Sequence, residues 1–157
     1  MESYLAHNIK HRQYANDEFM TPPELAKILL AKVPIFPNST ILDPCPGDGA
    51  FTIGIGLAPD EDFLEFDLSF DWIITNPPYS DLDRWLEHSF IIARCGIALL
   101  LGLHNITPKR LELANKYGFG LTQMHLCKVF HWFGISAFCI WVKGSKDIVT
   151  YDRIVWR

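Results

Sequence analysis

Short apolar runs alternate with amphipathic stretches along this chain. The apolar runs have the length of strands, and the last of them is continuous, as expected for a central strand that is covered on both faces of a sheet. They lie at residues 40–43, 71–75 and 96–101. Apolar residues at helical spacing separate the runs and predict three helices. These helices are expected to begin at Thr21-Pro22-Pro23-Glu24, at Ser80 and at Thr107-Pro108.

The first two of these helix starts carry capping-box patterns. Thr21 is followed three residues later by Glu24, and Ser80 by Asp83. In such a box, each of the two side chains hydrogen-bonds to the backbone N–H of the other residue. We therefore expect Thr21 and Ser80 to cap their helices.

The last part of the chain predicts strands only. Residues 121–143 favour two strands joined through His131 to Gly134, and residues 148–156 alternate weakly, as an edge strand does. Helices that alternate with strands, followed by a hairpin, are typical of an α/β sandwich with a mainly parallel sheet and a C-terminal antiparallel hairpin. We expect a single domain over residues 19–157, with residues 1–18 as a tail or a loose cap.

Composition narrows the class of protein. Of the 157 residues, 49% are hydrophobic and 20% are charged, which is the profile of a soluble globular domain. No apolar run approaches the roughly 20 residues that span a bilayer, and the N-terminus has no signal-peptide core, so a cytoplasmic location is expected. The formal net charge of -4 gives no global basic field, although local clusters such as Lys109-Arg110 could still meet phosphates.

The cysteines and tryptophans are expected to serve packing. The four cysteines have no CxxC or Cys/His spacing, so no metal site is expected. Residues expected in the core are Cys95, Cys127, Cys139, Trp72, Trp85 and Trp141.

A turn rich in proline and glycine follows the first strand directly. It reads Asp43-Pro44-Cys45-Pro46-Gly47-Asp48-Gly49-Ala50-Phe51. Glycines allow a ligand to approach the backbone closely, and a carboxylate at a strand end can accept a hydrogen bond from an ammonium or hydroxyl group. A structural strand-to-helix turn would look similar, so this segment alone does not decide the function.

Asn76-Pro77-Pro78-Tyr79 follows the second strand. The two prolines remove backbone donors and leave carbonyl acceptors, the Asn76 amide offers another acceptor, and the Tyr79 ring offers a flat face for stacking. This set suits a planar group that bears an amine. Because ligands of parallel sheets bind beyond the carboxyl ends of the strands, both turns are expected to line one cleft.

Together these segments resemble the S-adenosylmethionine-dependent amino-methyltransferases, and in particular the compact, phage-type adenine-N6 DNA methyltransferases. The glycine turn looks like their cofactor motif, with Asp43, Pro44, Gly47, Gly49 and Phe51 at its positions, and Asn76 to Tyr79 matches their catalytic motif. Phe19-Met20-Thr21-Pro22 resembles the segment whose Thr-Pro approaches the methionine carboxylate. Asp62-Phe63-Leu64 looks like the segment whose Asp and Phe contact the cofactor's adenine.

The resemblance implies a Rossmann-like methyltransferase sandwich and a mechanism. A target adenine would flip out of its stack onto Tyr79, and Asn76 with the Pro77 carbonyl would hold its N6 amine. An activated methyl group needs placement and polarisation more than a strong base. DNA is the expected partner and S-adenosylmethionine the cofactor, in the cytoplasm or, for a virus-encoded protein, in that of the host. The protein is expected to act as a monomer or homodimer.

The chain departs from this family's usual pattern in two ways. Members usually place a helix and a second strand, which ends in a ribose-binding acid, before the Asp62 segment, whereas only 52–61 lies there. Either Asp60 or Glu61 substitutes, or the cofactor binds poorly. No separate target-recognition domain fits within the chain, so specificity would come from the tail, the helix after Ser80, the hairpin near His131 to Phe133, or a second subunit.

Several alternatives stay open. RNA adenine is compatible with the motifs, as is the side-chain amide of a protein glutamine, although Asp43-Pro44 and Phe51 favour adenine. A catalytically degenerate methyltransferase fold would serve as a binding module. His131-Trp132-Phe133 could supply an aromatic wall for a flipped base or ordinary packing. His104 and Asn105 fall at the same sheet edge, where a structural or solvent-bridging role is expected.

Overall fold

The computed structural model describes residues 20–129, 132 and 134–156. The expected tail at residues 1–18, and with it Phe19, His131 and Phe133, lies outside the described residues. The helices and strands, in chain order, are α2 (Pro23–Leu30), β1 (Ile41–Asp43), β2 (Ile55–Gly56), the 3₁₀ turn η1 (Phe63–Glu65), β3 (Phe70–Thr75), α3 (Leu82–Ile92), β4 (Ala93–Gly102), the 3₁₀ turn η2 (Leu103–Asn105), α4 (Pro108–Lys116), β5 (Phe119–Cys127), β6 (Ser136–Lys143) and β7 (Thr150–Arg153). None of the described helices is long and apolar enough to cross a bilayer.

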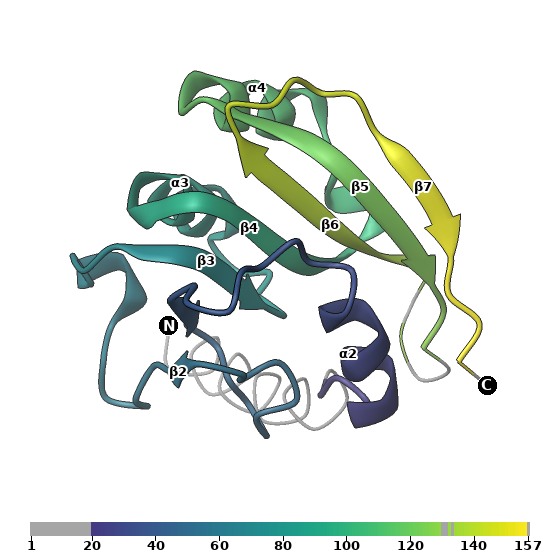
Figure 1. The fold of residues 1–157 in the computed structure, drawn as a ribbon, viewed down its shortest axis with the longest axis horizontal. Helices are drawn as coiled ribbons and strands as arrows, with labels where there is room; N and C mark the ends of the chain where they lie inside the picture. Colours follow the sequence, from purple (N-terminus) through teal and green to yellow (C-terminus); the bar gives the residue numbers. More distant parts are fainter. Residues whose placement is uncertain (1–19, 130–131, 133, 157) are drawn as a thin grey trace, which may run out of the picture.

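One seven-stranded sheet organises the chain, in the order β2-β1-β3-β4-β6-β5-β7 (Figure 1). β1 pairs in parallel with β2 and β3, and β3 pairs in parallel with β4. β6 then runs antiparallel to both β4 and β5, which makes the C-terminal hairpin, and β7 pairs in parallel with the outer side of β5. The expected mainly parallel α/β fold with a C-terminal antiparallel hairpin is confirmed.

The sheet separates two apolar layers, because successive side chains of a strand point to opposite faces. In β3, Ile73 packs on the face that α3 and α4 cover, whereas Trp72 and Ile74 pack on the face that α2 covers. α3 buries Trp85 and Phe90 on the first face. The chain is therefore a three-layer sandwich, and the central strands are buried on both sides, as their continuous apolar runs predict.

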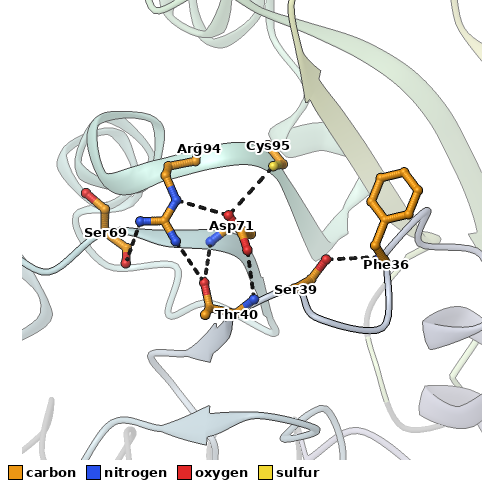
Figure 2. Close-up of polar contacts among 7 residues, drawn as sticks. All are labelled: Phe36, Ser39, Thr40, Ser69, Asp71, Arg94 and Cys95. Atoms are coloured by element: carbon orange, nitrogen blue, oxygen red, sulfur yellow. Dashed lines mark hydrogen bonds and ion pairs between the residues drawn. The ribbon is translucent and has the colours of Figure 1, made fainter.

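A polar network fixes the amino-terminal ends of β1, β3 and β4 (Figure 2). The Arg94 guanidinium donates to the Asp71 carboxylate at 3.0 Å, to the Thr40 hydroxyl at 3.1 Å and to the Ser69 carbonyl at 3.3 Å. Asp71 also exchanges two hydrogen bonds of 2.9 Å with Thr40, one through its carboxylate and one through its N–H. These contacts hold the strand register at the edge opposite to the one where ligands of parallel sheets bind.

Two predicted helix caps are wrong. α2 begins at Pro23 with Pro22 as its N-cap and no side-chain cap, because the Thr21 hydroxyl accepts a hydrogen bond from Asn76 instead. α3 begins at Leu82 after Asp81, whose left-handed conformation (φ 61°) directs the chain out of the preceding turn, and it also has no side-chain cap. The predicted helix start at Thr107-Pro108 is confirmed, and Thr107 caps α4, since its hydroxyl accepts from the N–H of Arg110.

Of the two edge strands of the sheet, the sequence predicts one and misses the other. β7 lies within the predicted edge segment 148–156. β2 was not predicted, because it has only two residues and both are exposed, so no apolar alternation marks it. It pairs with β1 at a place where a Cβ on Gly54 would lie 2.4 Å from the Ile41 carbonyl oxygen. Only glycine allows this close approach.

Candidate active site

The ends of three neighbouring parallel strands form the candidate site. β1 ends at Asp43, β3 at Thr75 and β4 at Gly102, and the three strands are adjacent in the sheet. We call this side of the molecule the carboxyl edge. Both predicted turns leave from it, one after Asp43 and the other after Thr75, as the sequence predicts.

The turn after β1 depends on its glycines. Gly47 has a φ of 55° and Gly49 a φ of 88°, conformations that residues with a Cβ rarely adopt. The Gly49 N–H donates to the Pro46 carbonyl at 2.7 Å, which closes the turn. A Cβ on Gly49 would meet no atom within 4 Å, so the turn borders open space among the described residues. The chain then continues to β2 without forming a helix.

Phe51 ends this turn inside the core. It is 2% exposed and stacks on Phe138 with 5.6 Å between the ring centroids. Its position therefore anchors the turn to the sheet, and the ring itself offers almost no surface to a ligand.

The carboxylate of Asp43 is buried beneath the turn, with 2% of the residue exposed. One oxygen accepts from the Cys45 N–H at 3.2 Å and the other from the Thr52 hydroxyl at 2.8 Å. Burial raises the pKa of Asp43 above its usual value, and hydrogen bonds from Thr75, Thr52 and the Cys45 N–H oppose that shift without cancelling it. A cationic or hydrogen-donating ligand would stabilise the ionised form of this buried carboxyl group.

Direct contacts join the two turns. The Thr75 hydroxyl donates to the Cys45 carbonyl oxygen at 3.3 Å, and the Asn76 side-chain amide donates to the Thr21 hydroxyl at 3.4 Å. The sulfur of Met20 lies 3.3 Å from the place where a Cβ on Gly47 would be. Three segments far apart in the sequence thus meet at the carboxyl edge: the one before α2, the glycine turn and the turn after β3.

Tyr79 extends the site to the end of β4. The residue is 40% exposed, and the backbone N–H of Gly102 donates to its hydroxyl oxygen. Partial burial raises the pKa of the Tyr79 hydroxyl, and the contact with Gly102 lowers it less. Pro77 is buried whereas Pro78 is exposed. The neutral phenol ring therefore lies at the protein surface with its hydroxyl end fixed.

The Asp62 segment forms the N-terminal part of η1. The Asp62 carboxylate caps this turn by accepting from the Leu64 N–H at 3.0 Å. Phe63 is 5% exposed and packs on Trp85 and His88, with centroid distances of 4.5 and 4.9 Å. Phe63 is mainly a core residue that ties η1 to α3, so most of its ring surface is already covered.

The predicted aromatic wall is only partly within the described residues. Trp132 is 5% exposed and packs in the same apolar layer as Phe51 and Phe138. Its ring is therefore part of the core and offers little exposed surface. Two hollows among the described residues, one between α3 and α4 and one beside the start of β5, are not lined by the glycine turn or by Asn76 to Tyr79.

Sequence reasoning missed two residues of the site. Thr75 is fully buried and connects the two turns, and its only signal is a hydroxyl at the end of an otherwise apolar strand. The backbone N–H of Gly102 donates to the Tyr79 hydroxyl oxygen, and the only sequence signal of Gly102 is its place at the end of the central apolar run.

Comparisons with solved structures identify the fold. The magnesium protoporphyrin IX methyltransferase of Synechocystis PCC 6803 is similar over 86% of this chain and 80% of its own, with a TM-score of 0.58 and 13% sequence identity. The M protein of the type I restriction enzyme EcoKI is similar over 86% of this chain and 48% of its own, with a TM-score of 0.65 and 13% identity. This chain thus spans about half of the EcoKI M protein.

The sheet topology and these similarities together show that the chain has the Rossmann-like methyltransferase fold. No protein-family model matches the sequence, and no curated protein matches it either.

Proposed function

We propose that this chain binds S-adenosylmethionine at the carboxyl edge and transfers its methyl group to the N6 amine of an adenine in DNA. The observation that carries the proposal is that the turn after β3 contacts both the glycine turn, through Thr75 and Cys45, and the segment before α2, through Asn76 and Thr21. These contacts bring together the segments that the sequence resemblance assigns to the cofactor and to the amine.

The glycine turn suits the cofactor. Gly47 and Gly49 present backbone beside open space, and the buried Asp43 carboxylate would hold a cationic or hydroxyl group of the cofactor. The similar Synechocystis methyltransferase was crystallised both with bound SAM and with bound SAH. Thr21 and Pro22 would lie against the methionine part, while Asp62 and Phe63 would border the adenine ring.

The turn after β3 suits the amine. The Asn76 amide nitrogen is held by Thr21, which orients the amide oxygen as an acceptor for an N–H group. The Pro77 carbonyl would accept the second amine hydrogen. A base stacked on Tyr79 would then present the lone pair of its amine nitrogen away from both acceptors.

The chemistry needs little beyond this placement. The sulfonium of the cofactor supplies a methyl group that is already activated. The residues therefore have to orient the amine, polarise it and exclude water, which are the contributions that a rigid set of acceptors can make. The neutral phenol of Tyr79 contributes a stacking face.

Three other functions compete with this proposal. RNA adenine and the side-chain amide of a protein glutamine would fit the same acceptors. Asp43-Pro44 and Phe51 favour adenine over glutamine. A degenerate binding module is motivated by the short segment 52–61, which forms no helix, but the Asn76 and Tyr79 turn argues against it.

The test measures cofactor binding and methyl transfer separately. Calorimetric titration with S-adenosylmethionine, followed by transfer of a labelled methyl group to DNA, RNA and protein extracts, is expected to show binding and incorporation into DNA adenine. Asn76→Ala is expected to abolish transfer while it leaves cofactor affinity largely intact. Asn115→Ala is the matched control, because Asn115 makes a comparable 3.0 Å contact with Asp147 away from the site. Absence of binding at millimolar cofactor would favour the degenerate module.

A further inference from the structure

The His104 side chain lies beside Gly102 at the end of β4, the residue that also contacts Tyr79. A Cβ on Gly102 would lie 2.8 Å from Cε1 and 3.1 Å from Nδ1 of His104, so the imidazole covers the α-carbon of this glycine. The backbone N–H of the same glycine binds the Tyr79 hydroxyl. The imidazole and the phenol therefore meet the same backbone residue.

The turn that carries His104 is held on both sides. The Leu103 N–H donates to the Ile135 carbonyl at 2.8 Å, which joins η2 to the start of β6. After His104, the Arg110 guanidinium donates to the Asn105 carbonyl at 2.9 Å and to the Asn105 side-chain oxygen at 3.3 Å. The backbone on either side of the histidine is thus fixed by contacts from two other parts of the fold.

The imidazole itself has a different environment. His104 is exposed, and neither ring nitrogen hydrogen-bonds to another of the described residues. A histidine that served only to support the turn would be expected to bond to it, as His88 and His125 do with their neighbours. The fixed backbone and the exposed ring point to a ligand that approaches from solvent.

We infer that His104 donates a hydrogen bond to the nucleotide stacked on Tyr79, and that residue 102 is glycine so that the imidazole can lie there. This inference rests on the proposed function. The acceptor is either a ring nitrogen of the base or an oxygen of its phosphate, since both accept from an imidazole N–H. Because Asn76 lies at the other end of the Asn76–Tyr79 turn, His104 would contact a part of the nucleotide that is remote from its amine.

The experiment compares two acceptors. Steady-state methyl transfer is measured with free deoxyadenosine and with a short oligonucleotide that contains one adenine. His104→Ala is expected to raise KM for the oligonucleotide about tenfold, as loss of one good hydrogen bond would, with kcat and cofactor affinity unchanged. A rise with both substrates identifies the base as acceptor, and a rise with the oligonucleotide alone identifies the phosphate.

Companion variants separate this contact from a structural effect. Gly102→Ala is expected to displace the imidazole and to raise KM as His104→Ala does, while the double variant is no worse than either single one. His104→Gln, which keeps a donor, should recover part of the loss. Lys109→Ala is the control for general attraction to phosphate, because Lys109 is 84% exposed in its side chain on the same edge.

Three results would overturn the inference. An unchanged KM in His104→Ala, with an active wild-type enzyme, removes His104 and leaves the proposed function standing. Equal effects of Lys109→Ala and His104→Ala would show a general charge effect. A wild-type protein that methylates neither substrate nor longer DNA overturns the proposed function and this inference together.

Discussion

The hydroxyl of Thr75 holds the two turns of the site together, so its removal tests the arrangement directly. Thr75 is fully buried, and its hydroxyl lies within hydrogen-bonding reach of the Cys45 carbonyl, at 3.3 Å, and of the Asp43 carboxylate. Thr75→Val keeps the size of the side chain and removes only the donor. Thr75→Ser keeps the donor and removes only a methyl group.

The magnitude follows from what the valine leaves behind. A buried acceptor that loses its donor costs about 1–3 kcal/mol, and the added methyl group offsets up to about 0.8 kcal/mol. We therefore expect Thr75→Val to lower the free energy of unfolding by about 1–2 kcal/mol, which corresponds to a fall in Tm of about 2–8 °C for a chain of this size. Thr75→Ser should lose less and keep its cofactor affinity.

The loss should depend on pH through Asp43. Burial already raises the pKa of this carboxyl group in the folded protein, and the Thr75 hydroxyl opposes the shift. Without Thr75 the folded-state pKa rises further. A carboxyl group whose pKa is higher in the folded than in the unfolded protein contributes stability below its unfolded-state pKa. That contribution is lost as the pH rises through its folded-state pKa. The difference between Thr75→Val and wild type should therefore be larger at neutral pH than near pH 4, about the ordinary carboxyl pKa.

The assay is urea unfolding of wild type, Thr75→Val and Thr75→Ser at both pH values, together with titration by S-adenosylmethionine. The valine variant should bind the cofactor more weakly at neutral pH, because less of Asp43 is ionised and the glycine turn is no longer tied to β3. If the valine and serine variants unfold alike and bind the cofactor alike, the hydroxyl does not join the two turns and the reasoning fails.

Three further predictions concern the scaffold. Gly54→Ala should destabilise the protein, measured by thermal unfolding, since its Cβ would lie 2.4 Å from a β1 carbonyl oxygen. Partial burial would raise the pKa of Asp152, but contacts led by the hydrogen bond with His125 lower it overall. The stability from this pair, below about 1 kcal/mol at such exposure, should be lost in acid unfolding as the pH falls through the lowered pKa of Asp152. Asp152→Asn should remove this pH dependence of stability. Exposed Cys95 should react with a thiol reagent in the folded protein, whereas Cys139, buried and with a strongly raised pKa, should react only on unfolding.

The sequence predicts the central sheet well because burial there is nearly complete. Residues 72–75 of β3 and 96–101 of β4 are buried, so these positions are apolar or small, whereas Asp71 at the start of β3 is only half-buried. The same logic places Trp72, Trp85 and Trp141 correctly in the core. It fails for Cys95, which was expected to be buried but lies exposed near the amino-terminal end of β4.

Local signals fail where a distant contact replaces them. Thr21 has the right neighbours for a capping box, but its hydroxyl accepts from Asn76, which lies 55 positions further along the chain. Asp81 takes a left-handed conformation immediately after the Tyr79 turn, and α3 begins one residue later than any cap at Ser80 would allow. Both errors fall next to the candidate site: a contact between segments replaces the cap at Thr21, and the left-handed Asp81 delays the start of α3.

The shortened segment after the glycine turn limits how the cofactor can be held. β2 pairs with β1 directly, and the exposed acids follow it in the sequence at 60–62. The Glu61 carboxylate accepts from the Ala58 N–H at 3.1 Å and that of Asp62 from the Leu64 N–H at 3.0 Å, so both already stabilise the backbone. Asp60 makes no hydrogen bond to the other described residues. Of the two acids that could bind the ribose of a cofactor, Asp60 can turn to a hydroxyl without giving up an existing contact, whereas the Glu61 carboxylate would have to give up its hydrogen bond to the Ala58 N–H.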